Sequence, residues 1–144
     1  MPNTKTAAIT WTGSDLSFSA IGGSGYTTAL GSAAGPGVAS PMEIVAIASG
    51  ACTAMDVIDI LRKKRQEVTG FQVNVLGIRS EEHPKVFTQI DLEFVVRGRG
   101  IDPKAVERAI ELSLTRYCSV NSMLEKAVKI NHRYRIEDVE AVAA

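Results

Sequence analysis

The chain has 144 residues, of which 45% are hydrophobic and 22% charged, which excludes a disordered chain and matches one globular domain. Sixteen basic residues balance sixteen acidic ones, so the charge footprint of a general nucleic-acid-binding protein is missing. No uninterrupted apolar run reaches about 18 residues, and no charged leader with an apolar block follows Met1. We therefore expect neither a membrane-spanning helix nor a secretory signal.

The first forty residues predict two strands and a loop. Residues 6–12 predict a short strand, and the alternation from Leu16 to Ala20 predicts a second one. A hairpin turn at residues 13–15 is expected to join them. Residues 21–40 are rich in glycine, serine and alanine, which predicts a long loop.

A long apolar helix is predicted to begin at Ser40. Ser40 is a typical cap, Pro41 suits the first helical position, and Glu43 completes a capping box. The residues from Ile44 to Leu61 are almost all apolar and small. We therefore expect this helix to be buried on most sides.

The rest of the chain predicts a hairpin, helices and a last strand. Alternation over residues 71–75 and 90–96 predicts two strands that pair as a hairpin. Asp102, followed by proline, opens a second helix, and Ser119 is expected to cap a short third helix. Residues 128–136 alternate as a last strand. This order of elements predicts an α+β fold.

We expect a single domain over residues 1–144, because no linker-like stretch separates two complete hydrophobic patterns. Its expected parts are N-terminal strands with a glycine-rich loop (1–39), a central buried helix (40–66), a hairpin (68–98), a second helix (102–117), and a short helix with the last strand (119–137).

Two cysteines are the candidate chemical groups. Cys52 and Cys118 lie 66 residues apart, without a CxxC pair or a Cys/His cluster, so we expect no metal site. Cys52 lies among small residues in the apolar helix, where Gly50 costs about 1 kcal/mol relative to alanine and indicates a packing or functional reason. Cys118 lies between two helices, where a helix N-terminus and the nearby Arg116 would favour its thiolate. Each cysteine is either a reactive thiol or a small core residue.

The other polar candidates have simpler interpretations. His132 falls on the apolar face of the last strand, which indicates a hydrogen-bonded core histidine rather than a catalytic base. His83 lies in a turn and is expected to be solvated. The four basic residues at 62–65 are expected to form a solvated helix end, with an anion-binding patch as the alternative.

Two sequence blocks carry a resemblance to a known family. The first is Ser-Pro-Met-Glu-Ile-Val at residues 40–45, leading into Gly-Ala-Cys-Thr-Ala at 50–54, and the second is Tyr-Cys-Ser-Val at 117–120. With these blocks the chain resembles the OsmC/Ohr family of thiol-dependent hydroperoxide reductases. The similarity covers roughly residues 5–137.

The resemblance implies an intertwined homodimer in which strongly bent antiparallel sheets wrap two central buried helices. It implies that Cys52 is the peroxidatic thiol and Cys118 the resolving thiol, with Glu43 and Arg116 as candidate supporting residues. An apolar pocket at the dimer interface would take an organic hydroperoxide. An external thiol or a dihydrolipoyl group would reduce the disulfide, with no bound cofactor and no metal, in the cytoplasm, and without nucleic-acid or membrane partners.

The chain departs from the peroxidase branches of the family at two positions. Those branches carry an arginine in the N-terminal half, whereas the first arginine here is Arg62. They also place a glutamate directly after the helix-opening proline, where this chain has Met42. Glu43 is shifted by one residue, and at about 100° per residue it falls on the helix face opposite Cys52.

The charge around Cys52 keeps an alternative function open. Asp56 follows Cys52 by one helical turn and is expected to oppose thiolate formation. A replacement cation would come from Arg62, Arg116, Lys5 or the other subunit. Without one, we expect a dimer that senses redox state or binds a small apolar ligand, or a structural dimer with packed cysteines.

Overall fold

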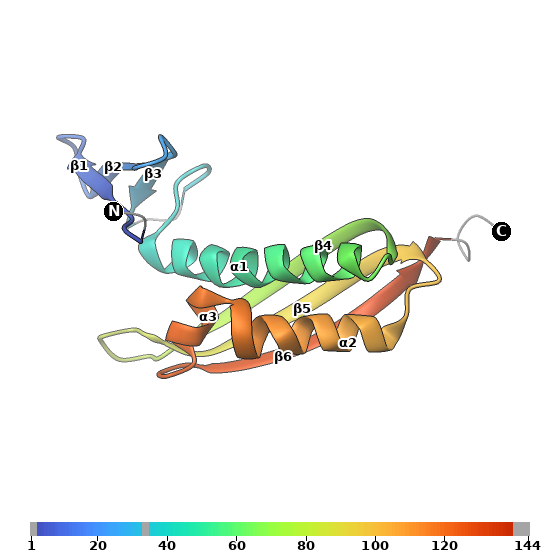
Figure 1. Ribbon diagram of the computed structural model, residues 1–144. Coiled ribbons are helices and arrows are strands. Elements are labelled where there is room, and N and C mark those ends of the chain that lie inside the picture. The colour runs from blue at the N-terminus through green and yellow to red at the C-terminus, as the bar shows by residue number, and fades with distance from the viewer. Residues whose placement is uncertain (1–2, 33–34, 140–144) are drawn as a thin grey trace. The chain divides into compact units, whose positions relative to one another are not determined.

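The described residues form two separate three-stranded sheets, one before the first helix and one after it (Figure 1). The computed structural model describes residues 3–32 and 35–139. Contacts divide the chain into two units, Met1–Val45 and Ala46–Ala144, and the boundary falls inside the first helix. A single domain over residues 1–144 stays a prediction.

The first unit is an antiparallel meander in the order β1-β2-β3. Its strands are β1 (Ala7–Trp11), β2 (Ser17–Gly22) and β3 (Thr27–Gly31). Gly13 and Gly25 turn the chain between strands with φ of 94°, a conformation that glycine adopts without strain. The predicted hairpin at residues 13–15 is confirmed.

The strand β3 lies inside the segment that the sequence predicts as a loop. Its residues are Thr-Thr-Ala-Leu-Gly, so only one large apolar side chain marks the strand. This segment has no strand pattern of its own, and it becomes a strand because it pairs with β2. The prediction of an unbroken loop over residues 21–40 is therefore wrong.

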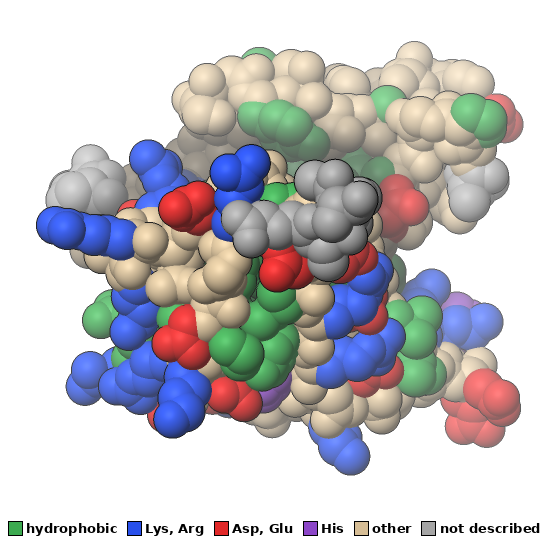
Figure 2. All heavy atoms as spheres, turned by 90° about the vertical axis from the view of Figure 1, so that its right-hand side faces the viewer, with side chains coloured by type: hydrophobic (Ala, Val, Ile, Leu, Met, Phe, Trp, Pro, Cys, Tyr) green, Lys and Arg blue, Asp and Glu red, His purple; other side chains and the backbone are tan. Residues whose placement is uncertain are grey.

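The helix α1 (Pro41–Lys63) begins where the sequence predicts. The Glu43 backbone N–H donates to Ser40 Oγ over 3.2 Å, so the serine cap is confirmed. Residues 62–65, at the far end of α1, are exposed, and Lys63 Nζ lies 2.9 Å from Asp59 Oδ2. In Figure 2, which faces the side where α1 ends, basic and acidic side chains are interspersed, as expected of a solvated helix end.

Within one chain, α1 is buried on one face only. Its fully buried positions follow helical spacing and are Ser49, Gly50, Thr53, Val57 and Leu61. The opposite face is open, with Ile47 exposed at 56% and Met55 at 70%. The prediction of burial on most sides is wrong for the isolated chain, because within residues 46–139 no described element covers this apolar face.

By length and composition α1 qualifies as a membrane-spanning helix, with a mean hydropathy of 1.8 over 18 residues and 28% of that window buried. It is the one such helix among residues 3–32 and 35–139. The same composition is found in core helices of soluble proteins. A Cβ added at Gly50 would lie 2.6 Å from Val75 Cγ2, so α1 packs closely on a strand, as a core helix does.

The second unit contains a mixed sheet in the order β4-β5-β6. Its elements in chain order are β4 (Glu67–Arg79), β5 (Phe87–Arg99), α2 (Pro103–Leu112), a π-helical turn (Ser113–Tyr117), α3 (Ser119–Leu124) and β6 (Lys129–Asp138). The predicted β4–β5 hairpin is confirmed, and so is the α+β class. The expectation of purely antiparallel sheets is wrong for β5 and β6, which are parallel because the helical segment between them returns the chain to the same end.

The core of the second unit lies between the sheet and the helices on one of its faces (Figure 1). The central strand β5 contributes Ile90, Leu92, Phe94 and Val96, all fully buried. The helix α2 begins at an Asp102 cap whose carboxylate accepts from the Lys104 N–H. Its apolar stripe, which includes Val106, Ala109 and Ile110, is buried.

Candidate dithiol site

The second unit brings the two cysteines together. Cys52 lies in the middle of α1 and is half-buried, whereas Cys118 ends the π-helical turn and is fully buried. Both are free thiols, and Cys52 is among the neighbouring groups that raise the pKa of Cys118, which indicates that the two side chains lie close to each other. The π-helical turn, which is distant in sequence from α1, thus places the Cys118 sulfur near the Cys52 thiol.

Cys118 is itself the cap of α3. Its backbone is extended, and its sulfur accepts a hydrogen bond from the Asn121 backbone N–H over 3.4 Å. The prediction that Ser119 caps this helix is therefore off by one residue, because the sulfur takes the place of the usual hydroxyl oxygen. The Cys118 N–H also donates to the Ser113 carbonyl over 2.7 Å, which closes the π-helical turn.

Buried hydroxyl groups connect the π-helical turn to α1. Thr53 Oγ1 lies 2.8 Å from Ser113 Oγ, and the Ser113 hydroxyl donates to Asp56 Oδ2 over 2.9 Å. A serine hydroxyl has a single proton, so Thr53 is the donor in its bond with Ser113. The chain of donors therefore runs from Thr53 through Ser113 to the Asp56 carboxylate.

A second polar contact ties α3 to α1. The Ser49 hydroxyl donates to Asn121 Oδ1 over 2.6 Å, and Asn121 Nδ2 donates to the Ser49 carbonyl over 3.1 Å. Neither side chain is more than 2% exposed. Cys118 is thus flanked in sequence by two residues that are each hydrogen-bonded to α1.

The environment of Cys118 favours the protonated thiol. Burial, together with the hydrogen bond and charge of Cys52 and the charge of Asp56, raises the pKa of Cys118 from 9.0 to about 12, although the Asn121 N–H acts in the opposite direction. The expectation that the helix N-terminus and Arg116 favour the thiolate is wrong, because desolvation outweighs the single N–H. Within the part of the chain that the structure describes, no cation is among the groups that act on Cys118.

The two candidate supporting residues lie outside this cluster. Glu43 is exposed near the start of α1, about 13 Å along the helix axis from Cys52. Arg116 is exposed on the π-helical turn, two residues before Cys118. The structure therefore does not join either residue to the thiols, and their supporting roles stay predictions.

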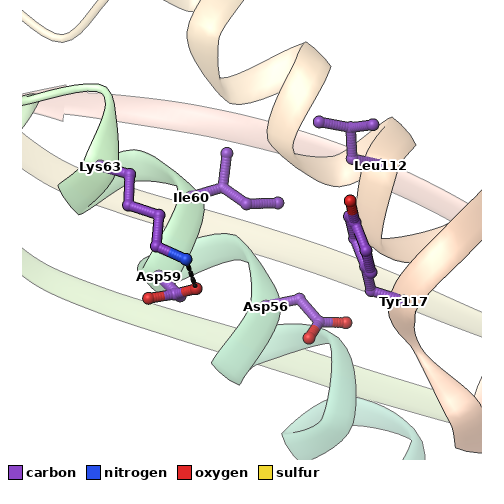
Figure 3. A pocket seen from close by; sticks show the side chains of 6 residues that line it. All are labelled: Asp56, Asp59, Ile60, Lys63, Leu112 and Tyr117. Atoms are coloured by element: carbon purple, nitrogen blue, oxygen red, sulfur yellow. Dashed lines mark ion pairs between the residues drawn. The ribbon is translucent and has the colours of Figure 1, made fainter.

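A pocket of about 460 Å³ adjoins the polar cluster. Asp56 and Tyr117 line it from different elements, α1 and the π-helical turn (Figure 3). The other lining residues are Asp59, Ile60, Lys63 and Leu112. Because Asp56 also accepts from Ser113, this carboxylate connects the buried network to the pocket.

The structure corrects one histidine prediction and agrees with the other. His132 is exposed on β6, in a shallow hollow beside Glu107 and Tyr134, so the prediction of a core histidine is wrong. The physical reason is that β6 is an edge strand of its sheet, so only β5 lies beside it and the His132 side chain is left uncovered. His83 is exposed, as predicted. Over residues 3–32 and 35–139 no group of three or more His, Cys, Asp or Glu could hold a metal ion.

Sequence reasoning missed the buried polar residues of the site. The four buried polar side chains of the described chain are Ser49, Thr53, Ser113 and Asn121, and all of them belong to this cluster. On α1 a signal was present. Ser49, Thr53 and Asp56 follow each other at four and three residues, so they share the face of Cys52 within residues 44–58, a stretch whose other side chains are apolar or small.

Fold and site define the class of protein. The chain matches the family described as OsmC-like protein over residues 34–133, and it therefore belongs to this family. The resemblance to the OsmC/Ohr family is confirmed.

Individual proteins are similar to the chain over nearly its whole length. The chain is 43% identical to protein YhfA of Escherichia coli (strain K12) over 130 residues, which cover 90% of this chain and 96% of YhfA. A hypothetical protein from Aquifex aeolicus VF5 has a TM-score of 0.84 at 29% identity, covering 94% of this chain and 98% of that one. An organic hydroperoxide resistance protein from Elizabethkingia anophelis shares the fold, with a TM-score of 0.70 at 13% identity over 93% of this chain and 96% of that one.

Proposed function

We propose that this protein is a thiol peroxidase that reduces organic hydroperoxides through a Cys52–Cys118 dithiol and disulfide cycle, in defence against oxidative stress. The observation that carries the proposal is the proximity of the two cysteine side chains within one unit of the chain, where Cys52 acts on the pKa of Cys118. Membership of the OsmC family and the fold shared with a protein named for organic hydroperoxide resistance support it.

The cycle balances without a bound cofactor. The Cys52 sulfur attacks the outer peroxide oxygen, the O–O bond breaks, and the alcohol leaves with a sulfenic acid on Cys52. The Cys118 sulfur then attacks Cys52, so the S–OH bond breaks, a disulfide forms and water leaves with the Cys118 proton. A thiol or dihydrolipoyl reductant donates two electrons and two protons to restore both thiols. We place this cycle in the cytoplasm, where a reducing compartment keeps thiols available.

The open face of α1 supports a homodimer. Ile47 and Met55 are large, exposed and on one side of this helix. A second copy of the chain would bury these side chains, and each would contribute roughly 25 cal/mol per Å² of apolar surface removed from water. Analytical ultracentrifugation should give twice the mass of one chain, and Met55→Glu should shift the protein toward the monomer.

A second function is favoured by the charges near the thiols. No arginine precedes Arg62 in the chain, and the charges that act on Cys118 are those of Cys52 and of the Asp56 carboxylate, both of which raise its pKa. A thiol without a cation ionises poorly and reacts slowly with peroxide. The alternative is a dimer of the same fold that senses redox state or holds a small apolar ligand.

Peroxide consumption separates these functions. We expect wild-type protein with cumene hydroperoxide and dithiothreitol or reduced lipoamide to consume the peroxide repeatedly. Cys52→Ser should abolish turnover, whereas Cys118→Ser treated with the peroxide in the absence of added thiol should react once and leave a sulfenic acid that dimedone traps. Equal, slow loss of peroxide with wild type and Cys52→Ser would eliminate the peroxidase in favour of the sensor or binding dimer.

A further inference from the structure

We propose that Ser113, held by Asp56 and Thr53, is a positioning residue that fixes Cys118 beside Cys52 for closure of the disulfide. This inference rests on the dithiol cycle proposed above and adds Ser113, a residue that lies outside the two sequence blocks.

The hydroxyl and the carbonyl of Ser113 both form hydrogen bonds, the hydroxyl with α1 and the carbonyl with Cys118. Its hydroxyl donates to Asp56 over 2.9 Å and accepts from Thr53 over 2.8 Å, both on α1. Its carbonyl accepts from the Cys118 N–H over 2.7 Å. One residue therefore links the helix that carries Cys52 to the backbone of Cys118.

Burial makes this link stiff. Ser113, Thr53 and Cys118 are each fully buried, so their own polar groups find no water when a bond is lost, whereas the Asp56 carboxylate is part-buried. The bond to Asp56 is charge-assisted, and such bonds are roughly twice as strong as those between neutral groups. An unpaired hydroxyl at this depth costs about 1–3 kcal/mol, which disfavours conformations in which the turn leaves α1.

The π-helical turn gives this link a direct effect on the sulfur. The turn spans Ser113–Tyr117 and is closed by the same Ser113 carbonyl that receives the Cys118 N–H. Cys118 ends the turn that Ser113 begins. A movement of Ser113 relative to α1 therefore also moves the Cα atom of Cys118. Misplacement of a reacting group by about 1 Å can cost on the order of a hundredfold in rate.

A redox equilibrium with glutathione measures this positioning without hydroperoxide. In the forward direction, one cysteine sulfur attacks oxidised glutathione and releases one glutathione thiol, leaving a mixed disulfide. The other cysteine sulfur then displaces the second glutathione thiol. Two electrons pass from the cysteine pair to glutathione, and the two cysteine protons go to the released thiols. The equilibrium constant therefore reports how readily the two cysteine sulfurs meet.

The experiment compares variants of the full chain equilibrated in buffers of reduced and oxidised glutathione. Samples are quenched in acid, alkylated after denaturation and analysed by mass, so the burial of Cys118 does not limit labelling. We expect Ser113→Ala and Asp56→Ala to lower the equilibrium constant for the disulfide at least about tenfold. Asp56→Asn and Ser113→Thr retain the hydrogen-bonding groups and should stay within about twofold of wild type.

Asp59→Ala is the matched control. Asp59 follows Asp56 by three residues on α1, lines the same pocket and pairs only with Lys63 in the salt bridges of the described residues, so its loss should leave the constant unchanged. Should Ser113→Ala fail to fold, as judged by circular dichroism, Asp56→Ala against Asp56→Asn decides the question.

The inference is overturned if wild-type protein forms no Cys52–Cys118 disulfide in these buffers. It is also overturned if Asp56→Ala and each folded Ser113→Ala sample match wild type. Failure of the proposed function gives a different result. If the wild type consumes no cumene hydroperoxide while the glutathione series keeps the expected order, the peroxidase is refuted and the positioning role stands.

Discussion

Removal of the Ser49 hydroxyl tests how strongly the buried polar contacts hold α3 against α1. Ser49 donates to Asn121 Oδ1 over 2.6 Å, and both residues are almost completely buried. In Ser49→Ala this amide oxygen loses its donor at a depth that water does not reach. We therefore expect the free energy of unfolding to fall by about 2 kcal/mol, within the range for a buried group left unpaired.

The assay is urea unfolding followed by circular dichroism, with every variant at one protein concentration because association changes apparent stability. A loss of about 2 kcal/mol corresponds to a decrease in Tm of roughly 4–8 °C for a chain of this size. Ser119→Ala is the control, because this serine is exposed at the start of α3, and it should change stability by less than about 0.5 kcal/mol.

A double-mutant cycle assigns the loss to the pair. In an Asn121→Leu background the Ser49 hydroxyl has no amide oxygen to bind, so Ser49→Ala should cost at least about 1 kcal/mol less than in the wild type. The reasoning is refuted if Ser49→Ala costs under about 0.5 kcal/mol, or if its cost is the same in both backgrounds.

Two further predictions concern the same helices. Gly50→Ala should lower the free energy of unfolding by about 1 kcal/mol in urea, because the new methyl group lies 2.6 Å from Val75 Cγ2 and this overpacking outweighs the gain in helix propensity; a more stable variant would contradict it. The Cys118 thiol, with its pKa raised from 9.0 to about 12 in the folded state, stays protonated while the unfolded state releases its proton, so stability falls as pH rises above 9. Between pH 8 and pH 10 wild type should lose about 1.4 kcal/mol more than Cys118→Ala, and parallel pH profiles would contradict this assignment.

Local sequence signals predicted much of the fold. The Ser40 cap of α1, the Asp102 cap of α2 and the β4–β5 hairpin all depend on residues that are neighbours or near neighbours in the chain. Turn and cap chemistry act over a few residues, so such features can be read from the sequence. The importance of Gly50 could also be predicted, although only the structure identifies Val75 as its neighbour.

Elements without a local signal were missed or misassigned. The strand β3 is too short and too poor in large side chains to stand out, and its order comes from β2. The parallel pairing of β5 with β6 depends on how the intervening helices return the chain, which no strand pattern encodes. The exposure of His132 follows from its position on an edge strand, a property of the sheet as a whole.

The sequence by itself identified the two thiols, their small or polar neighbours and the family blocks around them, because these features depend only on residue identity and on short spacings along the chain. Only the tertiary structure decided that Ser113 and Asn121 connect Cys118 to α1 from both sides. Those contacts span 57 and 72 residues, and they form because burial of Ser49, Ser113 and Asn121 leaves their polar groups only protein partners.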